Sequence, residues 1–288
     1  MNCNKTLSFT KMQGAGNDYI YIDCFKEDVS GLNIGELSQK MSDRHFGVGS
    51  DGLVLIMPSD NGCDLRMRMF NSDGSEAEMC GNASRCVAKY AYDHKIVTSN
   101  IFTLQTKAGK KVIEVFCNDN GLVEKATVNM EKPTLKPIDI PVNESGDILV
   151  AKPLKTFSHE WMITCVSMGN PHCVLFVDDV ANAPVHTEGP EIEINPKFPK
   201  KTNVEFAHVV NRNFIEMRVW ERGAGETMAC GTGACATLVA AVLNNLTDRK
   251  ATLKLLGGNL EIEWRESDND VYMTGAAEYV FDGVWSIQ

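Results

Sequence analysis

Two cysteines, Cys80 and Cys230, stand in nearly the same local sequence, each at the end of a Glu-x-x-x-Cys-Gly segment. Each Cys-Gly pair follows a glycine-containing turn and precedes a segment with helical character. The first turn of a helix carries unbonded N–H groups and partial positive charge, which lower the pKa of a cysteine and bind carboxylates. Either cysteine alone would be a small residue at a helix start, but the pair predicts thiol chemistry on a substrate that carries a carboxylate.

The two cysteines belong to an internal repeat. Residues 64–81, DLRMRMFNSDGSEAEMCG, align without gaps with residues 214–231, FIEMRVWERGAGETMACG, at an offset of 150 positions. Upstream, GNDYIYID resembles GNPHCVLFVD at an offset of 153 positions. Two matches in the same order, at nearly the same offset, predict two halves that share one fold.

Equivalent cysteines in two similar halves suit the inversion of a carbon centre. If the halves face each other, one thiolate removes a proton from one face of the carbon and the other thiol returns a proton to the opposite face. Helix N-termini directed at the substrate carboxylate would stabilise the charge that develops on it. The repeat therefore predicts a two-base racemase or epimerase.

The elements that position these cysteines follow from hydrophobic periodicity. Residues 65–70 and 215–220 alternate apolar with charged side chains, which is the period of a half-buried strand. Residues 234–243 are apolar on every side, so this helix must be buried all round, most simply inside a curved sheet. The equivalent residues 83–92 are more mixed. Further strands are predicted at residues 19–23, 53–57, 102–106, 112–116, 123–128, 162–167, 174–178, 252–256, 260–264 and 271–274.

One peripheral helix is predicted from about Ile34 to Arg44, because Asn33 can cap it with Glu36 at its third position. The proline-bearing residues 132–141 predict a linker near mid-chain. At roughly 150 residues per domain, a chain of 288 residues predicts two domains.

The segment GVGSDG at residues 47–52 matches the glycine pattern of dinucleotide-binding loops. Such a loop needs a strand before it and a helix after it. Here the predicted helix comes first and the strand follows, so the glycines predict a helix-to-strand turn instead.

Composition excludes several classes of protein. The formal net charge is −10 and Lys/Arg-rich runs are absent, which argues against nucleic acid or anionic membrane as partners. The first residues lack the apolar segment of a signal peptide, so we expect a soluble, cytoplasmic protein. Its ten cysteines should then be reduced, and the absence of Cys-x-x-Cys argues against zinc.

Six motifs, in order and over nearly the full chain, resemble those of diaminopimelate epimerases: FTKMQGAGNDY, NSDGSEAEMCGNASRC, SMGNPH, TNVEF, ERGAGETMACGTGAC and YMTGAAEYVFDG. The resemblance implies an α+β fold of two similar lobes, each a mixed β-sheet rolled around a central helix. We expect residues 1–130 plus 276–288 to form the lobe with Cys80, and residues 131–275 the lobe with Cys230. The implied reaction interconverts LL- and meso-2,6-diaminoheptanedioate, a lysine and cell-wall precursor, without pyridoxal phosphate, metal or any other cofactor. A homodimer is implied as well.

The same resemblance implies roles for individual residues. On the LL isomer Cys230 would be the base and Cys80 the acid, with the roles exchanged in reverse, and His172 and Glu221 would assist them. Arg222 would take the distal carboxylate through its planar fork, and Glu221 can pair with an ammonium group. The remaining substrate-binding residues would be Asn17, Asn71, Gly81, Asn82, Asn170, Asn203, Gly231 and Thr232.

Without the cysteines beside them, these residues would be read as turn asparagines, a structural histidine and a solvated surface pair. The sequence also departs from the family pattern. Ala83-Ser84 replace a common Gly-Ala pair, and Gly52 stands where some members carry a glutamine that contacts substrate.

Three other functions remain open at this point. A proline or hydroxyproline racemase-like enzyme would carry a histidine after its first Cys-Gly, where this chain has Asn82. A redox protein would use Cys80 and Cys230 as a disulfide pair, which the absence of Cys-x-x-Cys argues against. A non-catalytic binding protein of the same fold would be expected to have lost one of the two cysteines.

Overall fold

The structure is a computed structural model that describes residues 6–287. The chain divides into two compact units, an N-terminal unit of Met1–Val128 with Gly275–Gln288 and a C-terminal unit of Asn129–Thr274. Both units combine a mixed sheet with two helices, which is the expected α+β fold of two similar lobes. Among the described residues, no helix is both long and apolar enough to cross a membrane.

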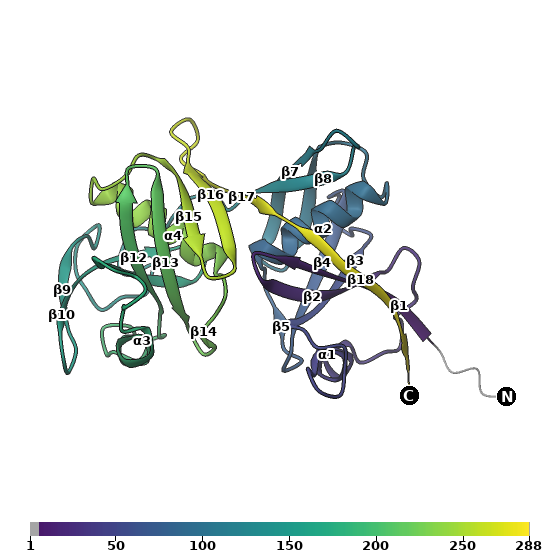
Figure 1. Cartoon of the computed structure of the whole chain (residues 1–288), viewed down its shortest axis with the longest axis horizontal. Coiled ribbons are helices and arrows are strands. Elements are labelled where there is room, and N and C mark those ends of the chain that lie inside the picture. The colour runs from purple at the N-terminus through teal and green to yellow at the C-terminus, as the bar shows by residue number, and fades with distance from the viewer. Residues whose placement is uncertain (1–5, 288) are drawn as a thin grey trace. The chain divides into compact units, whose positions relative to one another are not determined.

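In the N-terminal unit, one helix is enclosed by the sheet. Helix α2 packs against β1, β2, β3 and β7, and residues 81–91 are all buried (Figure 1). Strand β18 pairs with β1, β1 with β2, β3 with β4, and β6–β7–β8 follow one another, all antiparallel, whereas β2–β3 and β4–β6 are parallel. The elements are β1 (Thr6–Gly14), β2 (Asn17–Asp23), α1 (Ile34–Ser42), β3 (Gly52–Met57), β4 (Leu65–Asn71), β5 (Glu76–Ala77), α2 (Gly81–Asp93), β6 (Ile101–Thr106), β7 (Gly109–Cys117), β8 (Val123–Asn129) and β18 (Glu278–Ser286).

The C-terminal unit repeats this plan around α4. Antiparallel pairs join β10 to β11, β12 to β13 and β15 to β16 to β17, and parallel pairs join β11 to β12 and β13 to β15. Helix α4 contacts β10, β11, β12, β15 and β16, so the helix that is apolar on all sides is housed as predicted. The elements are β9 (Lys152–Lys155), β10 (Glu160–Ser167), β11 (Pro171–Phe176), α3 (Val185–Glu193), β12 (Asn203–Asn211), β13 (Phe214–Glu221), β14 (Gly225–Glu226), α4 (Gly231–Leu243), β15 (Lys250–Leu255), β16 (Gly258–Trp264) and β17 (Val271–Ala276).

The predicted peripheral helix α1 is confirmed, but it ends at Ser42 rather than Arg44. Its cap is the predicted one, since the Asn33 side chain accepts a hydrogen bond from the Glu36 N–H. The helix ends early because the N–H groups of Val48 and Gly49 turn back to the Met41 carbonyl. The glycine segment at residues 47–52 is therefore a helix-to-strand turn, as predicted.

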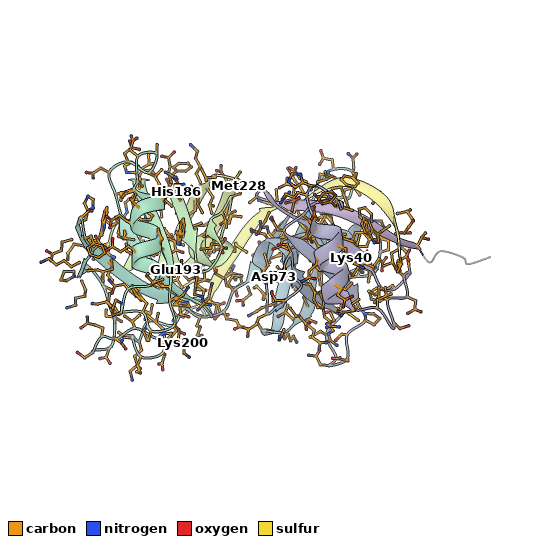
Figure 2. All side chains as sticks on the ribbon, turned by 90° about the horizontal axis from the view of Figure 1, so that it is seen from below. Lys40, Asp73, His186, Glu193, Lys200 and Met228 are labelled. Carbon is orange, nitrogen blue, oxygen red and sulfur yellow. The ribbon has the colours of Figure 1, made fainter. Side chains whose placement is uncertain are left out.

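Several sequence expectations need correction. Residues 132–141, predicted as a linker, belong to the C-terminal unit, where Ile140 is buried in the core, and strands β1, β9, β12 and β18 were not predicted. The strand predicted at residues 174–178 is β11, which begins at Pro171 and ends at Phe176. Helix α3 was not predicted, because Gly189 and Pro190 interrupt its helical pattern. Figure 2 labels His186 and Glu193, two side chains of α3 that contact the loop before Cys230.

Candidate active site

Cys80 and Cys230 occupy the N-cap positions of α2 and α4. Both have extended backbone, with φ −138° and ψ 122° at Cys80 and φ −117° and ψ 109° at Cys230. Each carbonyl accepts the first intrahelical bond at 2.9 Å, from Ser84 and Ala234 respectively. The sequence repeat is thus a repeat of geometry, with each sulfur one residue before a helix that begins with glycine.

A repeated ion pair holds the turn before each cysteine. Arg68 donates two hydrogen bonds to Glu76, at 2.8 and 3.2 Å, and Arg218 donates two to Glu226, at 2.6 and 3.1 Å. Each pair joins the strand before the turn to the short strand after it. Such two-pronged pairs fix geometry as well as charge, so they set where each helix starts.

The peripheral helices hold the same turns from outside. In the C-terminal unit, Glu193 on α3 accepts the Gly223 N–H at 3.1 Å, and His186 lies 2.7 Å from Glu226. In the N-terminal unit, Ser38 on α1 donates to the Asn71 carbonyl at 2.8 Å. Each helix therefore fixes the loop that leads to its unit's cysteine.

The Cys230 sulfur is buried and receives hydrogen bonds from its own helix. The Gly233 N–H donates to Sγ at 3.4 Å, and the Thr232 hydroxyl lies 3.4 Å away. Burial, followed by the nearby carboxylates of Glu221 and Glu205, raises the pKa of the Cys230 thiol, while the two hydrogen bonds oppose that rise. A thiolate formed here is therefore a strong base that the helix N-terminus still supports.

His172 connects a buried carboxyl group to this cysteine. Its Nδ1 lies 2.6 Å from Glu205 Oε1, and its Nε2 lies 3.0 Å from Asn170 Oδ1. The Asn170 amide then donates to the Thr232 hydroxyl at 3.2 Å. Side chains of both His172 and Glu205 are 0% exposed, and burial raises the pKa of Glu205. A hydrogen-bond chain therefore runs from Glu205 to the Cys230 sulfur.

Glu205 was not among the site residues predicted from the sequence. Its signal was a charged residue within the apolar TNVEF strand, but its partner His172 lies on β11, which pairs with β12 in parallel. Glu205 Oε2 has no hydrogen-bond partner among residues 6–287. Leaving a buried carboxyl oxygen without a hydrogen-bond partner lowers the stability of the fold, which indicates that Glu205 has a role beyond packing.

Cys80 has a different neighbour. The Asn17 Oδ1 lies 3.8 Å from its sulfur and accepts a hydrogen bond from the Asn82 amide at 3.0 Å. The Asn17 Nδ2 donates in the other direction, to Asp51 Oδ2, at 2.7 Å. Asn17 therefore presents an acceptor to the Cys80 sulfur, whereas Thr232 presents a hydroxyl to the Cys230 sulfur.

The sequence profile described as diaminopimelate epimerase matches residues 9–136 and 164–280. A diaminopimelate epimerase from Acetivibrio thermocellus is 56% identical over 277 residues, which cover 96% of this chain and 98% of that protein. One from Methanococcus maripaludis is 53% identical over 277 residues, which cover 96% of this chain and 99% of that protein. The chain belongs to the diaminopimelate epimerase family.

Solved structures more distant in sequence share the family's fold. A phenazine biosynthesis protein of the PhzF family from Bacillus anthracis has a TM-score of 0.70 at 15% identity, covering 98% of this chain and 100% of that one. A hydroxyproline epimerase from Agrobacterium vitis has a TM-score of 0.69 at 14% identity, over 100% of this chain and 94% of that one. At these identities the likeness concerns the fold alone.

The remaining residues expected from the diaminopimelate epimerases lie on strand ends and loops of the two units. Asn71 ends β4 and donates to Ser75 Oγ at 3.0 Å. Asn203 is buried, where its amide donates to the Pro171 carbonyl at 2.8 Å and its oxygen accepts the Arg222 N–H at 2.9 Å. Because both ends of the Asn203 side chain are bonded to backbone, its immediate role is to hold the Arg222 loop.

Glu221 and Arg222 follow β13 directly. Glu221 accepts a hydrogen bond from the Thr227 hydroxyl. Arg222 is exposed and donates to the Lys200 carbonyl at 3.2 Å, and no carboxylate within the described part of the chain lies within ion-pair distance of it. Its guanidinium is therefore available for an anionic group. Gly81 and Gly231 are the first residues of their helices.

The two departures from the diaminopimelate epimerase pattern have local explanations. The Ser84 hydroxyl is buried and donates to the Cys80 carbonyl at 2.9 Å, so it strengthens the helix start. A Cβ on Gly52 would stand 2.1 Å from the Phe70 carbonyl oxygen, so no side chain fits there without moving the strand. Over residues 6–287, no group of three or more His, Cys, Asp or Glu side chains is placed to hold a metal ion.

Proposed function

We propose that this chain interconverts LL- and meso-2,6-diaminoheptanedioate by a two-base transfer between Cys230, the substrate α-carbon and Cys80. The observation that carries the proposal is the pair of N-cap cysteines in equivalent settings, in a member of the diaminopimelate epimerase family. On the LL isomer, the Cys230 thiolate takes the α-proton and the electron pair of the C–H bond moves into the carboxylate. The Cys80 thiol then gives its proton to the opposite face, and the two cysteines have exchanged protonation states.

The helix N-termini stabilise the intermediate in this proposal. Backbone N–H groups at Gly81 and Gly231, with the side chains of Asn82 and Thr232, would hold the reacting carboxylate as its negative charge grows. The pre-set donors need no rearrangement when that charge appears. No cofactor is required, because the charge is held by donors that the protein already presents.

The rest of the substrate would be recognised by Arg222, Glu221 and four asparagine side chains. An exposed guanidinium without a carboxylate partner suits the distal carboxylate. Glu221 would pair with an ammonium group, and Asn17, Asn71, Asn170 and Asn203 would complete recognition directly or through the loops they hold. His172 would assist Cys230 through the chain that includes Asn170.

The assembly and location are also proposals. We propose a homodimer formed through β18, which pairs with β1 and exposes a row of apolar side chains. These include Val280 at 53% exposed and Val284 at 67% exposed. An edge strand of that kind invites a second strand. Residues 1–130 plus 276–288 and residues 131–275 would be the two substrate-binding lobes, in a cytoplasmic enzyme.

The test is incubation of the purified protein with LL-diaminoheptanedioate in deuterium oxide without added cofactor. The expected product is the meso isomer with one deuterium, at the inverted α-carbon only. Proline and hydroxyproline serve as control substrates and should not be inverted. Absence of the meso isomer, or inversion of proline at a comparable rate, would contradict the proposal.

A further inference from the structure

We propose that Asp51 is a positioning residue, which turns the Asn17 amide so that its carbonyl oxygen faces Cys80 and keeps this sulfur in the proton-bearing state that an acid requires. The inference rests on the proposed two-cysteine function and concerns only the N-terminal unit. Asp51 belongs to the glycine segment at residues 47–52, to which the proposed mechanism assigns no role.

The contacts of Asp51 leave the Asn17 amide one orientation. An ionised carboxylate only accepts hydrogen bonds. Asp51 Oδ2 accepts from Asn17 Nδ2 at 2.7 Å and from the Asp18 N–H at 3.1 Å. A reversed Asn17 amide would set two acceptors against each other at that distance, and would also turn its Nδ2 toward the amide of Asn82. The first conflict excludes the reversed form, whereas the Asn82 amide can turn over together with Asn17, because its Oδ1 has no hydrogen-bond partner among residues 6–287.

Asp51 is itself fixed by backbone and by charge. Its N–H donates to the Asp18 carbonyl at 2.8 Å, and its carbonyl accepts the Ser72 N–H at 3.1 Å. Arg44 bridges Asp51 and Asp18 at 2.9 Å each, and Lys11 pairs with Asp18 at 2.6 Å. The two carboxylates are thus matched by two cations, so the cluster anchors the amide while adding little net charge.

The repeat supplies a comparison inside the same molecule. Asn170 corresponds to Asn17, since both follow a glycine in the upstream match. The Asn170 amide is turned the other way, with Nδ2 toward Thr232 and Oδ1 toward His172. Within residues 6–287 no carboxylate accepts from Asn170, so it can adopt the opposite orientation. Asn17 thus presents its oxygen to Cys80, whereas Asn170 presents its Nδ2 to Thr232, the neighbour of the Cys230 sulfur.

An acceptor beside a sulfur favours the thiol, because the thiolate cannot donate and is repelled by a carbonyl oxygen. Tyr21 and Cys86 are titratable neighbours of Cys80 in this unit. Burial raises the pKa of Tyr21 well above its ordinary value and that of Cys86 to about 11, so both are neutral near pH 7. Neither adds charge beside Cys80 near pH 7, whereas the Asn17 oxygen accepts directly from its sulfur.

The test is the pH dependence of Cys80 alkylation by iodoacetamide, measured by peptide mapping in the full-length protein without substrate. Asp51→Ala removes the anchor and lets the amide reverse, so the alkylation midpoint of Cys80 should fall by about one pH unit, as expected for gain of a hydrogen bond to the thiolate. Asp51→Asn keeps an acceptor oxygen at the Oδ2 position without the charge, and should retain the wild-type midpoint. Alkylation of Cys230 is the internal reference and should not change in either variant.

Arg44→Gln is the matched control, because it breaks the ion pair and leaves Asp51 to accept from Asn17, so the Cys80 midpoint should stay within about 0.3 pH units. An unchanged midpoint in Asp51→Ala would overturn the inference. Equal falls in Asp51→Ala and Asp51→Asn would overturn it too, because charge and not orientation would then be responsible. If Asp51→Ala does not fold, a lowered midpoint in Asp51→Asn alone refutes the anchoring role. None of these measurements needs turnover, so failure of the wild type to epimerise would count against the proposed function only.

Discussion

Replacing Glu205 with glutamine should change how stability depends on pH. Glu205 and His172 are 0% exposed, and their nearest atoms are 2.6 Å apart. Burial raises the pKa of Glu205, and the neighbouring His172 only partly offsets that rise. Glutamine has nearly the same shape and can still bond to the His172 ring, so the substitution removes a titrating group with little loss of packing.

The direction of this pH dependence follows from the linkage between proton binding and folding. A carboxyl group with a raised pKa in the folded state contributes its full stability below its unfolded pKa, about 4.3, and loses that contribution as the pH rises through the folded pKa. The wild type should therefore lose stability relative to Glu205→Gln as the pH increases from 5 to 8. While the folded state retains the proton and the unfolded state has lost it, the difference changes by up to about 1.4 kcal/mol per pH unit.

The measurement is urea unfolding of both proteins at half-unit steps between pH 5 and pH 8. Glu193→Gln provides the control, because Glu193 is also buried but accepts bonds from Trp220 and Gly223. Although burial opposes it, those bonds help to lower the pKa of Glu193. Its contribution is lost only in acid, so its difference from wild type should be flat over this range. A flat difference for Glu205→Gln as well would refute the argument that Glu205 retains a proton in the core.

Three further outcomes are expected. Cys80→Ala and Cys230→Ala should each lower kcat by at least about 10²-fold, measured with LL-diaminoheptanedioate, whereas Cys117→Ala, at an exposed strand end, should keep wild-type turnover. Arg222→Lys should raise KM about tenfold with a smaller change in kcat, because lysine keeps the charge and loses the two-pronged fit; an unchanged KM would make Arg222 a surface residue. Gly52→Gln should lower the free energy of unfolding by about 1–3 kcal/mol, because even its Cβ would lie 2.1 Å from a carbonyl oxygen; thermal melting at wild-type temperature would contradict this.

The sequence predicted the fold where its signal was local or repeated. The cap of α1 by Asn33, the alternating strands that became β4 and β13, and the all-apolar helix α4 are each encoded within one segment. The duplication was detectable because the glutamates that bind Arg68 and Arg218 keep the same spacing from the cysteines in both halves. The helical segments were predicted from residues 83 and 234, whereas the helices begin two and three residues earlier, at Gly81 and Gly231.

The connections behind the candidate site could not be predicted, because they join residues that are distant in sequence. Glu205 matters through His172, which is on another strand, and the parallel register of β11 with β12 brings the two together. Asp51 matters through Asn17, across the parallel pair β2 and β3. A single sequence gives no register for such strand pairs. Glu205 in TNVEF and Asp51 in GVGSDG therefore could not be distinguished from ordinary polar residues.

The pairing of β18 with β1 has a consequence for synthesis on the ribosome. The C-terminal unit, Asn129–Thr274, is one continuous stretch, whereas the N-terminal unit needs Glu278–Ser286 to cover β1. Translation proceeds at about 5–20 residues per second, so β1 waits roughly 15 to 60 seconds for its neighbour after it leaves the tunnel. During that interval β1 can pair with β2, but its other edge stays open until the last residues of the chain are made. The half that is made first is therefore the half that is finished last, and it is the one that nascent-chain chaperones would need to protect.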